Sequence, residues 1–177
     1  MIKFGAKELR KMEAPEEQKK LLKKNPVYII LDNVLDTYNI GSVFRLADAV
    51  AATKVYLCAG SETPPNSRIK KASINTTEWV DWEYAESAVE AIARIRNKES
   101  GIRVFAIEQD PRSVPYDTID YQFPVALVVG HESDGVSQEV MDVCDAIVEM
   151  PMWGVNKSLN VMVSLGIVLY KVMEGKI

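Results

Sequence analysis

The sequence has few of the residues that build metal sites and disulfide frameworks. Its 177 residues include a single histidine, His131, and only two cysteines, Cys58 and Cys144. One histidine excludes a multi-histidine metal site. Two widely separated cysteines are too few for a disulfide framework or a cysteine-based metal cluster. We therefore expect no bound metal and a reducing compartment.

Long apolar runs are also missing. No stretch reaches the roughly 18 consecutive apolar residues of a membrane-spanning helix, and the opening residues lack the apolar core of a signal peptide. The motif G-x-G-x-x-G does not occur, and Val136 follows the Gly130–Gly135 loop where a Walker motif has lysine. These absences predict a cytoplasmic protein without a membrane partner. They argue against a Rossmann dinucleotide site and a Walker NTPase.

Negative charge is in slight excess, and the positive charge is unevenly placed. The net charge of −4 argues against a generally basic nucleic-acid binder. Residues 1–24 hold eight Lys or Arg against four Glu, a balance of +4, so the rest of the chain carries −8. This basic segment is either a local phosphate contact or a solvated helical face. We treat residues 1–25 as a short basic helical extension before one domain over residues 26–177.

Apolar stretches alternate with amphipathic ones along this domain. An apolar content of 47% suits one globular domain with a sizeable core. The alternation indicates an α/β fold with a mostly parallel sheet and helices on both of its faces. The expected strands are Val27–Leu31, Val55–Cys58, Trp79–Trp82, Val104–Ile107, Ala126–Val129 and Ala146–Met150. The expected helices are 6–24 with a break at Pro15, Asn39–Ala51, Arg68–Ile74, Ala85–Lys98, Val136–Val143 and Ser158 to about Val172, with an irregular connection over Gln109–Gln122.

Three of the expected strands are followed by unusual polar groups. After the first strand, Asn39 and Arg45 are six residues apart, nearly two helical turns, so both could face the same way if the helix begins at Asn39. Arg45 has Val43, Phe44 and Leu46 as sequence neighbours, which is unusual for a charged residue on an otherwise apolar helix. Arg45 is either a functional cation or a surface arginine that extends into solvent.

The second polar group is the loop Gly130–Gly135, whose two glycines after a strand indicate a loop lined by backbone groups. The third follows the last expected strand. Pro151 and Gly154 end that strand, and Ser158 is a good helix N-cap because its hydroxyl can accept a backbone N–H. A polar loop between a buried strand and a buried helix is where an open α/β sheet binds its ligand. Ser158 and Asn160 could also serve the helix alone.

Together these segments resemble the SpoU family, also called TrmH-like RNA ribose methyltransferases, of the SPOUT superfamily. The resemblance covers about residues 26–173. The first motif matches at Asn39, Gly41, Arg45, Ala47 and Asp48. The second matches at Gly130, Glu132 and Gly135, followed by Val136-Ser137. The third matches at Pro151-Met152, Gly154 and Ser158-Leu159-Asn160-Val161, while Leu46, Ala51 and Met162 depart from the residues that the family often has.

The resemblance implies a fold, a cofactor and a product. The fold is an α/β domain with a deep trefoil knot at its C-terminal end, a rare exception to the rule against threaded chains. The cofactor is S-adenosylmethionine, held by loops near residues 129–135, 148–152 and 157–160. The product is a 2′-O-methylated ribose in tRNA or rRNA, formed by a homodimer with its site near the subunit interface. The implied cofactor-binding residues are Val129, Gly130, Glu132, Gly135, Met150, Met152, Ser158 and Leu159.

The resemblance also assigns chemical roles. A ribose 2′-OH is a weak nucleophile that must lose its proton during in-line attack on a methyl group. Arg45 is implied at the 2′-OH, either as a base once a substrate phosphate engages it or as an electrostatic and orienting group, because a free guanidinium is a poor base. Asn39 would fix Arg45 or the ribose, and Ser158 and Asn160 would shape the pocket. Glu132 would order the loop or an arginine of the neighbouring subunit.

Two surfaces are predicted to meet partners. Arg68, Lys70 and Lys71 are expected to bind RNA phosphates together with the basic N-terminal helix, or else to form a solvated cluster. The last helix is apolar all round, so one side should pack on the sheet and the other on a second copy of the chain. This hypothesis takes Val168 as an outward residue whose replacement by glutamate would break the dimer.

Two alternatives stay open at this point. One is a catalytically silent relative that binds RNA or senses the cofactor, although the presence of both Asn39 and Arg45 argues against it. The other is an RNA base methyltransferase of the same superfamily. The sequence names neither the target RNA nor the nucleotide.

Overall fold

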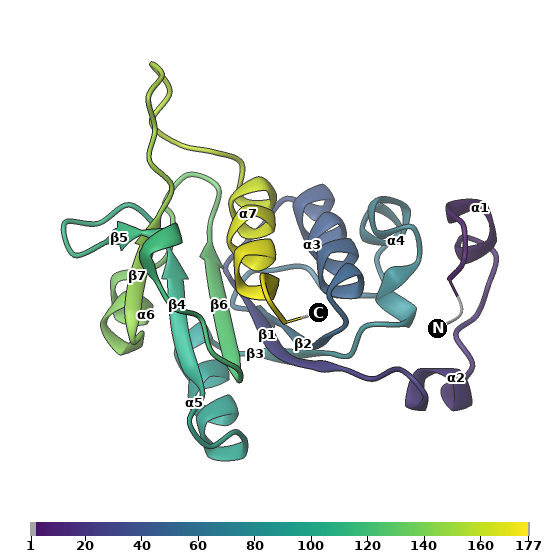
Figure 1. Ribbon diagram of the computed structural model, residues 1–177. Coiled ribbons are helices and arrows are strands. Elements are labelled where there is room, and N and C mark those ends of the chain that lie inside the picture. The colour runs from purple at the N-terminus through teal and green to yellow at the C-terminus, as the bar shows by residue number, and fades with distance from the viewer. Residues whose placement is uncertain (1–2, 177) are drawn as a thin grey trace.

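The structure, a computed structural model, describes residues 3–176 and has an α/β architecture (Figure 1). Its 7-stranded sheet has the order β3-β2-β1-β6-β4-β7-β5, and all neighbouring strands are parallel. The strands are β1 (Asn25–Asp32), β2 (Ala52–Cys58), β3 (Trp82–Ala85), β4 (Arg103–Ile107), β5 (Val114–Pro115), β6 (Val125–Gly130) and β7 (Ala146–Glu149). The helices are α1 (Ala6–Leu9), α2 (Glu16–Lys20), α3 (Thr37–Ala49), α4 (Ser67–Ser73), α5 (Ala88–Lys98), α6 (Gln138–Val143) and α7 (Val161–Met173), with 3-10 turns η1 (Thr76–Glu78) and η2 (Tyr116–Thr118).

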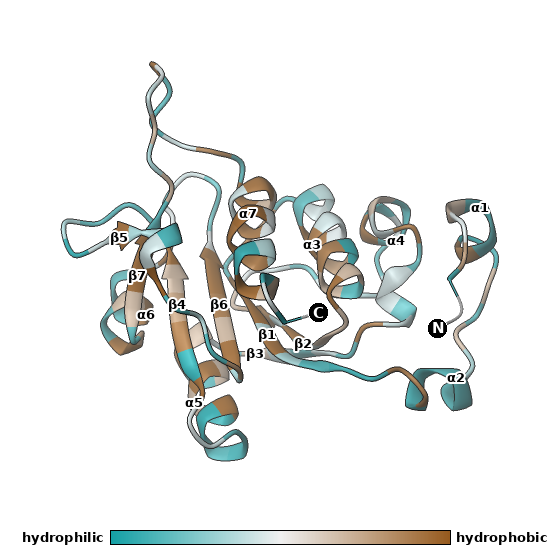
Figure 2. Cartoon of the chain, viewed as in Figure 1, coloured by the Kyte–Doolittle hydropathy of each residue, from teal (hydrophilic) through white to brown (hydrophobic). Residues whose placement is uncertain are grey.

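Helices cover both faces of the sheet, so its central strands are continuously apolar rather than alternating (Figure 2). All six residues of β6 are buried. On one face, α3, α4 and α7 contribute Phe44, Ile69 and Leu165 to a shared core. On the other face, α5 and α6 contribute Ile92 and Val140 to a second core. The predicted fold class, a parallel sheet between two helical layers, is confirmed.

A close approach between two helices explains one glycine of the first motif. Gly41 of α3 faces α4, and a Cβ at this position would lie 2.5 Å from Ala72 Cβ and 2.8 Å from the Ile69 carbonyl oxygen. A side chain there would collide with backbone atoms that cannot move aside easily. Glycine therefore allows α4 to lie directly against α3.

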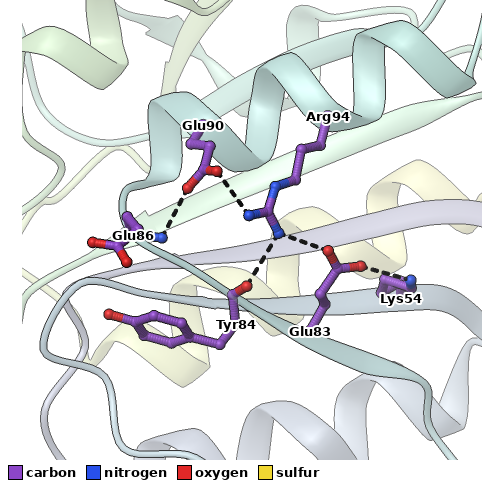
Figure 3. Close-up of polar contacts among 6 residues, drawn as sticks. All are labelled: Lys54, Glu83, Tyr84, Glu86, Glu90 and Arg94. Carbon is purple, nitrogen blue, oxygen red and sulfur yellow. Dashed lines mark hydrogen bonds and ion pairs between the residues drawn. The ribbon is translucent and has the colours of Figure 1, made fainter.

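An ion-pair network fastens the edge strand β3 (Figure 3). Arg94 of α5 donates to Glu83 at 2.6 Å, to the Tyr84 carbonyl at 3.2 Å and to Glu90 at 2.7 Å. Glu83 also accepts from Lys54 of β2 at 3.0 Å, and this bond, opposed by burial, holds the pKa of Glu83 below its usual value. Charged side chains on an edge strand discourage pairing with another chain. The network thus joins β3 to α5 and β2 and protects the sheet edge.

Most predicted elements are confirmed, with boundaries that move by up to three residues. The strand expected at Trp79–Trp82 is wrong: β3 begins at Trp82, where it pairs with Val55 of β2, while Trp79 and Val80 are buried outside the sheet. The expected irregular connection also contains β5 and η2. The knot stays a prediction.

The basic N-terminal segment is less helical than expected. Instead of one broken helix over 6–24, it contains α1 and α2, of four and five residues, and neither helix has a buried residue. Without a buried face, a short helix has little to stabilise it beyond its own weak propensity. Pro15 is the N-cap of α2 rather than a residue of its first turn.

The last helix begins three residues later than expected. Its N-cap is Asn160, whose Oδ1 accepts a hydrogen bond from the Met162 N–H at 2.9 Å. The prediction that Ser158 caps this helix is therefore wrong. Ser158 stays in the preceding extended segment, which projects away from the sheet between β7 and α7 (Figure 1).

The orientation predicted for Val168 is also wrong. Val168 is fully buried in the core of its own chain, on the same side of α7 as Leu165 and Leu169. The helix is apolar all round, but it has one covered side and one open side. The residues on the open side are Val163, Ile167 and Tyr170, which are 40%, 37% and 57% exposed.

Candidate active site

The carboxyl ends of neighbouring strands bring the three polar segments together. In the sheet, β1 pairs with β6, β6 with β4, and β4 with β7. The segments that follow β1, β6 and β7 carry Asn39, Glu132 and Asn160, respectively. Because the strands are parallel, these segments leave the sheet at the same edge, where open α/β sheets place their sites.

A chain of hydrogen bonds joins the three segments. Asn160 Nδ2 donates to Asn39 Oδ1 at 3.0 Å, and Asn39 Nδ2 donates to Glu132 Oε1 at 3.0 Å. The Glu132 carboxylate also accepts from the backbone N–H of Asp36 at 3.0 Å and of Leu35 at 3.2 Å. Asn39 is only 6% exposed. The structure therefore brings three predicted residues, Asn39, Glu132 and Asn160, into one network.

These donors keep Glu132 ionised. Burial raises its pKa, but the hydrogen bonds from Asn39 and from the N–H groups of Asp36 and Leu35 outweigh burial, so the pKa lies below its usual value. A lowered pKa in the folded state means that the carboxylate stabilises the protein above the unfolded pKa of about 4.3. This contribution is lost as the pH falls through the folded value. Glu132 thus orders a loop of its own chain.

The loop after β6 closes on itself as a tight turn. His131 N donates to the Gly135 carbonyl at 3.0 Å, and Gly135 N donates back to the His131 carbonyl at 2.9 Å. A Cβ on Gly130 would lie 2.1 Å from the Gly135 carbonyl carbon. Gly135 itself has a φ of +72°, a left-handed conformation that favours glycine. Both glycines are therefore required by the backbone of this turn.

Three further residues hold this edge of the sheet, and the sequence analysis did not single them out. Asp32 at the end of β1 accepts from Ser137 N at 2.9 Å and from Ser137 Oγ at 2.8 Å. Glu108, directly after β4, accepts from Val136 N at 2.9 Å. Gln109 donates to a carbonyl of the segment between β7 and α7. Their position at or directly after the end of an apolar strand is the sequence signal that could have identified them.

A cavity of about 530 Å³ lies among these segments, within the usual range of about 300–1,000 Å³ for small-molecule sites. Backbone and side chains of the loop after β6 form one wall, and the segment before α7 forms another. Its lining includes every residue that the resemblance assigned to the cofactor: Val129, Gly130, Glu132, Gly135, Met150, Met152, Ser158 and Leu159. Asn160 lines it as well.

Arg45 lies apart from this cavity. It is exposed on α3 and is not among the lining residues, whereas Asn39 is buried. Six residues at about 100° each turn Arg45 roughly 120° away from Asn39 around the helix. Within residues 3–176, no hydrogen bond or ion pair joins the two side chains. The expectation that both face the same way is wrong, and Asn39 does not fix Arg45 in this structure.

The basic residues predicted to bind RNA lie on a different surface. Arg68, Lys70 and Lys71 are exposed on α4, and none forms an ion pair within the part of the chain that the structure describes. Lys70 also lines a second cavity of about 530 Å³, together with Lys19 of α2 and Trp82 of β3. The structure therefore places these cations beside the N-terminal segment and away from the cavity described above.

Residues 3–176 contain neither a cluster of metal-ligating side chains nor a helix that could span a membrane. No group of three or more His, Cys, Asp or Glu side chains is arranged to hold a metal ion. No helix in this range is both long and apolar enough to cross a membrane.

Comparison with known proteins identifies relatives of the whole fold. The model of the SpoU rRNA Methylase family matches residues 26–170. A tRNA (guanosine(18)-2′-O)-methyltransferase of Aquifex aeolicus is 30% identical over 156 residues, which are 87% of this chain and 72% of that protein. A 23S rRNA (guanosine-2′-O-)-methyltransferase, RlmB, of Ralstonia nicotianae is 28% identical over 151 residues, 85% of this chain and 59% of that protein.

Solved structures of RNA-modifying enzymes have a fold similar to that of this chain. The A. aeolicus TrmH/SpoU tRNA modifying enzyme superimposes with a TM-score of 0.78 at 29% identity, covering 97% of this chain and 83% of that one. An AdoMet-bound rRNA methyltransferase from Sinorhizobium meliloti has a TM-score of 0.79 at 26% identity, covering 96% of this chain and 60% of that one. The chain thus spans from 59% to 83% of the lengths of these four relatives.

The direction of the hydrogen bond from Asn39 to Glu132 can be tested by exchanging the amide and the carboxylate between the two positions. Asn39→Asp would face the Glu132 carboxylate with a second carboxylate, so we expect loss of stability that is larger at pH 7 than near pH 4. Adding Glu132→Gln restores an N–H donor opposite the new carboxylate but gives up the acceptor of the Asp36 N–H, so the rescue should be partial. The double variant should therefore unfold at a higher denaturant concentration than Asn39→Asp alone at pH 7.

Denaturant unfolding of both variants at the two pH values measures this exchange. Asn39→Ala is the matched control, because it leaves both neighbours without a partner. It should cost about 1–3 kcal/mol and should not be rescued by Glu132→Gln. Equal stabilities for Asn39→Asp and the double variant would contradict the assigned donor and acceptor directions.

Proposed function

Because the chain belongs to the SpoU rRNA methylase family, we propose that it transfers a methyl group from S-adenosylmethionine to the 2′-OH of a ribose in tRNA or rRNA. One observation carries the proposal: the sheet brings three motif segments together, and all eight predicted cofactor residues line one cavity beside them. Two relatives support it, since their names specify guanosine 2′-O-methylation of tRNA and of rRNA. Such substrates would place the protein in the cytoplasm.

The cavity fits the proposed cofactor. The turn from Gly130 to Gly135 leaves no room for a Cβ at its first residue, where one would meet the Gly135 backbone, and both glycines line the cavity. Met150 and Leu159 supply apolar walls for an adenine ring, and Ser158 supplies a polar group. The sulfonium of S-adenosylmethionine would supply an activated methyl group. The chain's own task is then to position the acceptor hydroxyl and remove its proton.

We assign this task to Arg45, an exposed cation of the first motif. Arg45 projects from α3 into solvent, where a ribose with its neighbouring phosphate can reach it. A guanidinium stays protonated in proteins and binds phosphate through a planar fork of donors. We therefore favour an orienting and electrostatic role, in which Arg45 holds the phosphate beside the reacting ribose. The network of Asn39, Glu132 and Asn160 holds the first turn of α3, and Arg45 lies six residues further along the same helix.

Nucleoside analysis of the product tests the proposed reaction. Unmodified tRNA and rRNA transcripts are incubated with the protein and S-adenosylmethionine, digested to nucleosides and separated by mass spectrometry. We expect 2′-O-methylnucleosides, whose methyl group is on the sugar fragment. A methyl group on the base fragment would support a base methyltransferase instead. Cofactor binding without any methylated product would support a silent relative.

The role of Arg45 can be separated from cofactor binding. Arg45→Ala should leave the affinity for S-adenosylmethionine near that of the wild type, because Arg45 does not line the cavity. Turnover should fall roughly 10²–10⁴-fold if proton removal is impaired. Arg45→Lys keeps the charge but not the planar fork, so it should recover only part of the activity. Near-normal turnover in Arg45→Ala would refute the catalytic assignment.

The RNA surface is proposed on α4 and the N-terminal segment, which the structure joins. Asn75, buried after α4, donates from Nδ2 to the Leu9 carbonyl at 3.1 Å and to the Met12 carbonyl at 2.6 Å. Phe4 also packs on Trp79, with ring centroids 5.8 Å apart. These contacts hold the basic segment beside the exposed cations of α4. The two elements therefore form one positive surface suited to phosphates.

Salt dependence tests this surface. Neutralising Arg68, Lys70 and Lys71 to glutamine should weaken RNA binding and lower the slope of log affinity against log salt by about 2–3 units, since each lost phosphate contact removes about 0.7–0.9. Lys98→Gln on α5 is the matched control and should leave the slope unchanged. An unaltered slope in the triple variant would identify the cluster as a solvated surface.

A homodimer is proposed through the open side of α7. Val163, Ile167 and Tyr170 form an exposed stripe with spacings of four and three residues, and Leu46 of α3 lies next to it across Gly166. A stripe of this kind on an otherwise packed helix suits a two-fold partner with the same stripe. The site would then lie near the subunit interface, as the resemblance implies.

Two adjacent residues of α7 separate dimerisation from folding. Ile167→Glu puts a charge on the exposed stripe and should give a folded monomer of about the chain mass of 19.8 kDa. Val168→Glu puts a charge in the core and should prevent folding instead. Light scattering and far-UV circular dichroism distinguish these outcomes. A wild-type protein that is monomeric at micromolar concentration would refute the dimer.

A further inference from the structure

The only histidine of the chain lies in the turn after β6, and its ring is part of that turn. His131 Nδ1 accepts hydrogen bonds from the backbone N–H of Ser133 at 3.1 Å and of Asp134 at 3.2 Å. The His131 side chain is 20% exposed and lines the cavity. The backbone of His131 and Gly135 closes the same turn. The imidazole therefore occupies the centre of a turn that forms one cavity wall.

The two N–H donors at Nδ1 favour one protonation state of the ring. A nitrogen that accepts two N–H groups must present its lone pair, so the ring is neutral and carries its proton on Nε2. Protonation would add a hydrogen to Nδ1 that faces two donors, and both hydrogen bonds would be lost. We propose that neutral His131 is the positioning residue that shapes this turn for S-adenosylmethionine, and that its protonation weakens cofactor binding. This inference rests on one part of the proposed function, namely that the cavity binds S-adenosylmethionine.

The charged groups around His131 bear on whether its ring can be protonated. Asp134 Oδ2 lies 3.3 Å from Nδ1, but its side chain is 84% exposed, so solvent weakens its attraction for a protonated ring. Glu108, Glu132, Glu149 and Lys157 also line the cavity. Glu108 and Glu132 are already engaged by backbone N–H groups of neighbouring segments. A protonated Nδ1 would face the Asp134 carboxylate at 3.3 Å and would lose the two N–H groups that it accepts from in the neutral ring.

Two variants at His131 separate its acceptor atom from its titration. In His131→Asn, the side-chain Oδ1 takes the place of Nδ1 as an acceptor and does not titrate. In His131→Gln, the acceptor is one bond too far out for both N–H groups. We expect the calorimetric affinity of the wild type for S-adenosylmethionine to be about tenfold lower at pH 5.5 than at pH 7.5, because a protonated Nδ1 no longer accepts from the N–H groups of Ser133 and Asp134. His131→Asn should match the wild type at pH 7.5 and change less than about twofold with pH, whereas His131→Gln should bind more weakly at both pH values.

Nitrogen NMR gives an independent readout, since the only imidazole in the chain belongs to His131. At pH 7.5 its signals should identify the Nε2–H tautomer, and their titration should follow the loss of cofactor affinity. An Nδ1–H tautomer, a pH-independent wild-type affinity, or a His131→Asn variant as pH-dependent as the wild type would each overturn the assignment. Failure of the wild type to bind S-adenosylmethionine at any pH would instead overturn the proposed function.

Discussion

The site depends on one amide side chain that can donate and accept at the same time. Asn39 receives a hydrogen bond from Asn160 on one atom and gives one to Glu132 from the other. It is buried, so neither atom can exchange its partner for water without a cost of about 1–3 kcal/mol. The two hydrogen bonds of Asn39 thereby hold residues that are 93 and 121 positions away along the chain in one geometry. An aspartate in this place would leave Glu132 without the donor from this position, and a leucine or alanine would leave both Glu132 and Asn160 without it.

The parallel sheet makes this contact possible, and the loops complete it. Because β1, β6, β4 and β7 are neighbours, the segments after them meet without long connections. Asp32 and Glu108 then hold the backbone after the turn at residues 136 and 137. The same turn is closed by its own backbone and by the His131 ring. The cavity wall is therefore fixed by side chains from several strands rather than by the loop alone.

The sequence predicted the sheet and the motif positions well, because both are short-range patterns. Continuous apolar runs such as that of β1 occur where both faces of a sheet are covered. Orientation around a helix was predicted poorly. Val168 and Ile167 are equally apolar, and only packing against the sheet decides which one is buried. Asn160 rather than Ser158 caps α7 because its side chain also reaches Asn39, a contact that local sequence does not encode.

A double-mutant cycle on cofactor affinity tests the coupling of the three segments most directly. Asn160→Asp keeps the oxygen that caps α7 but removes the donor to Asn39, and Asn39→Ala removes the shared amide. If the hydrogen-bond chain acts as one unit, the two changes should be strongly non-additive in the dissociation constant for S-adenosylmethionine, with the double variant no weaker than the weaker single variant. Losses that add to within about 0.3–0.5 kcal/mol would show that the segments act independently and would contradict this account.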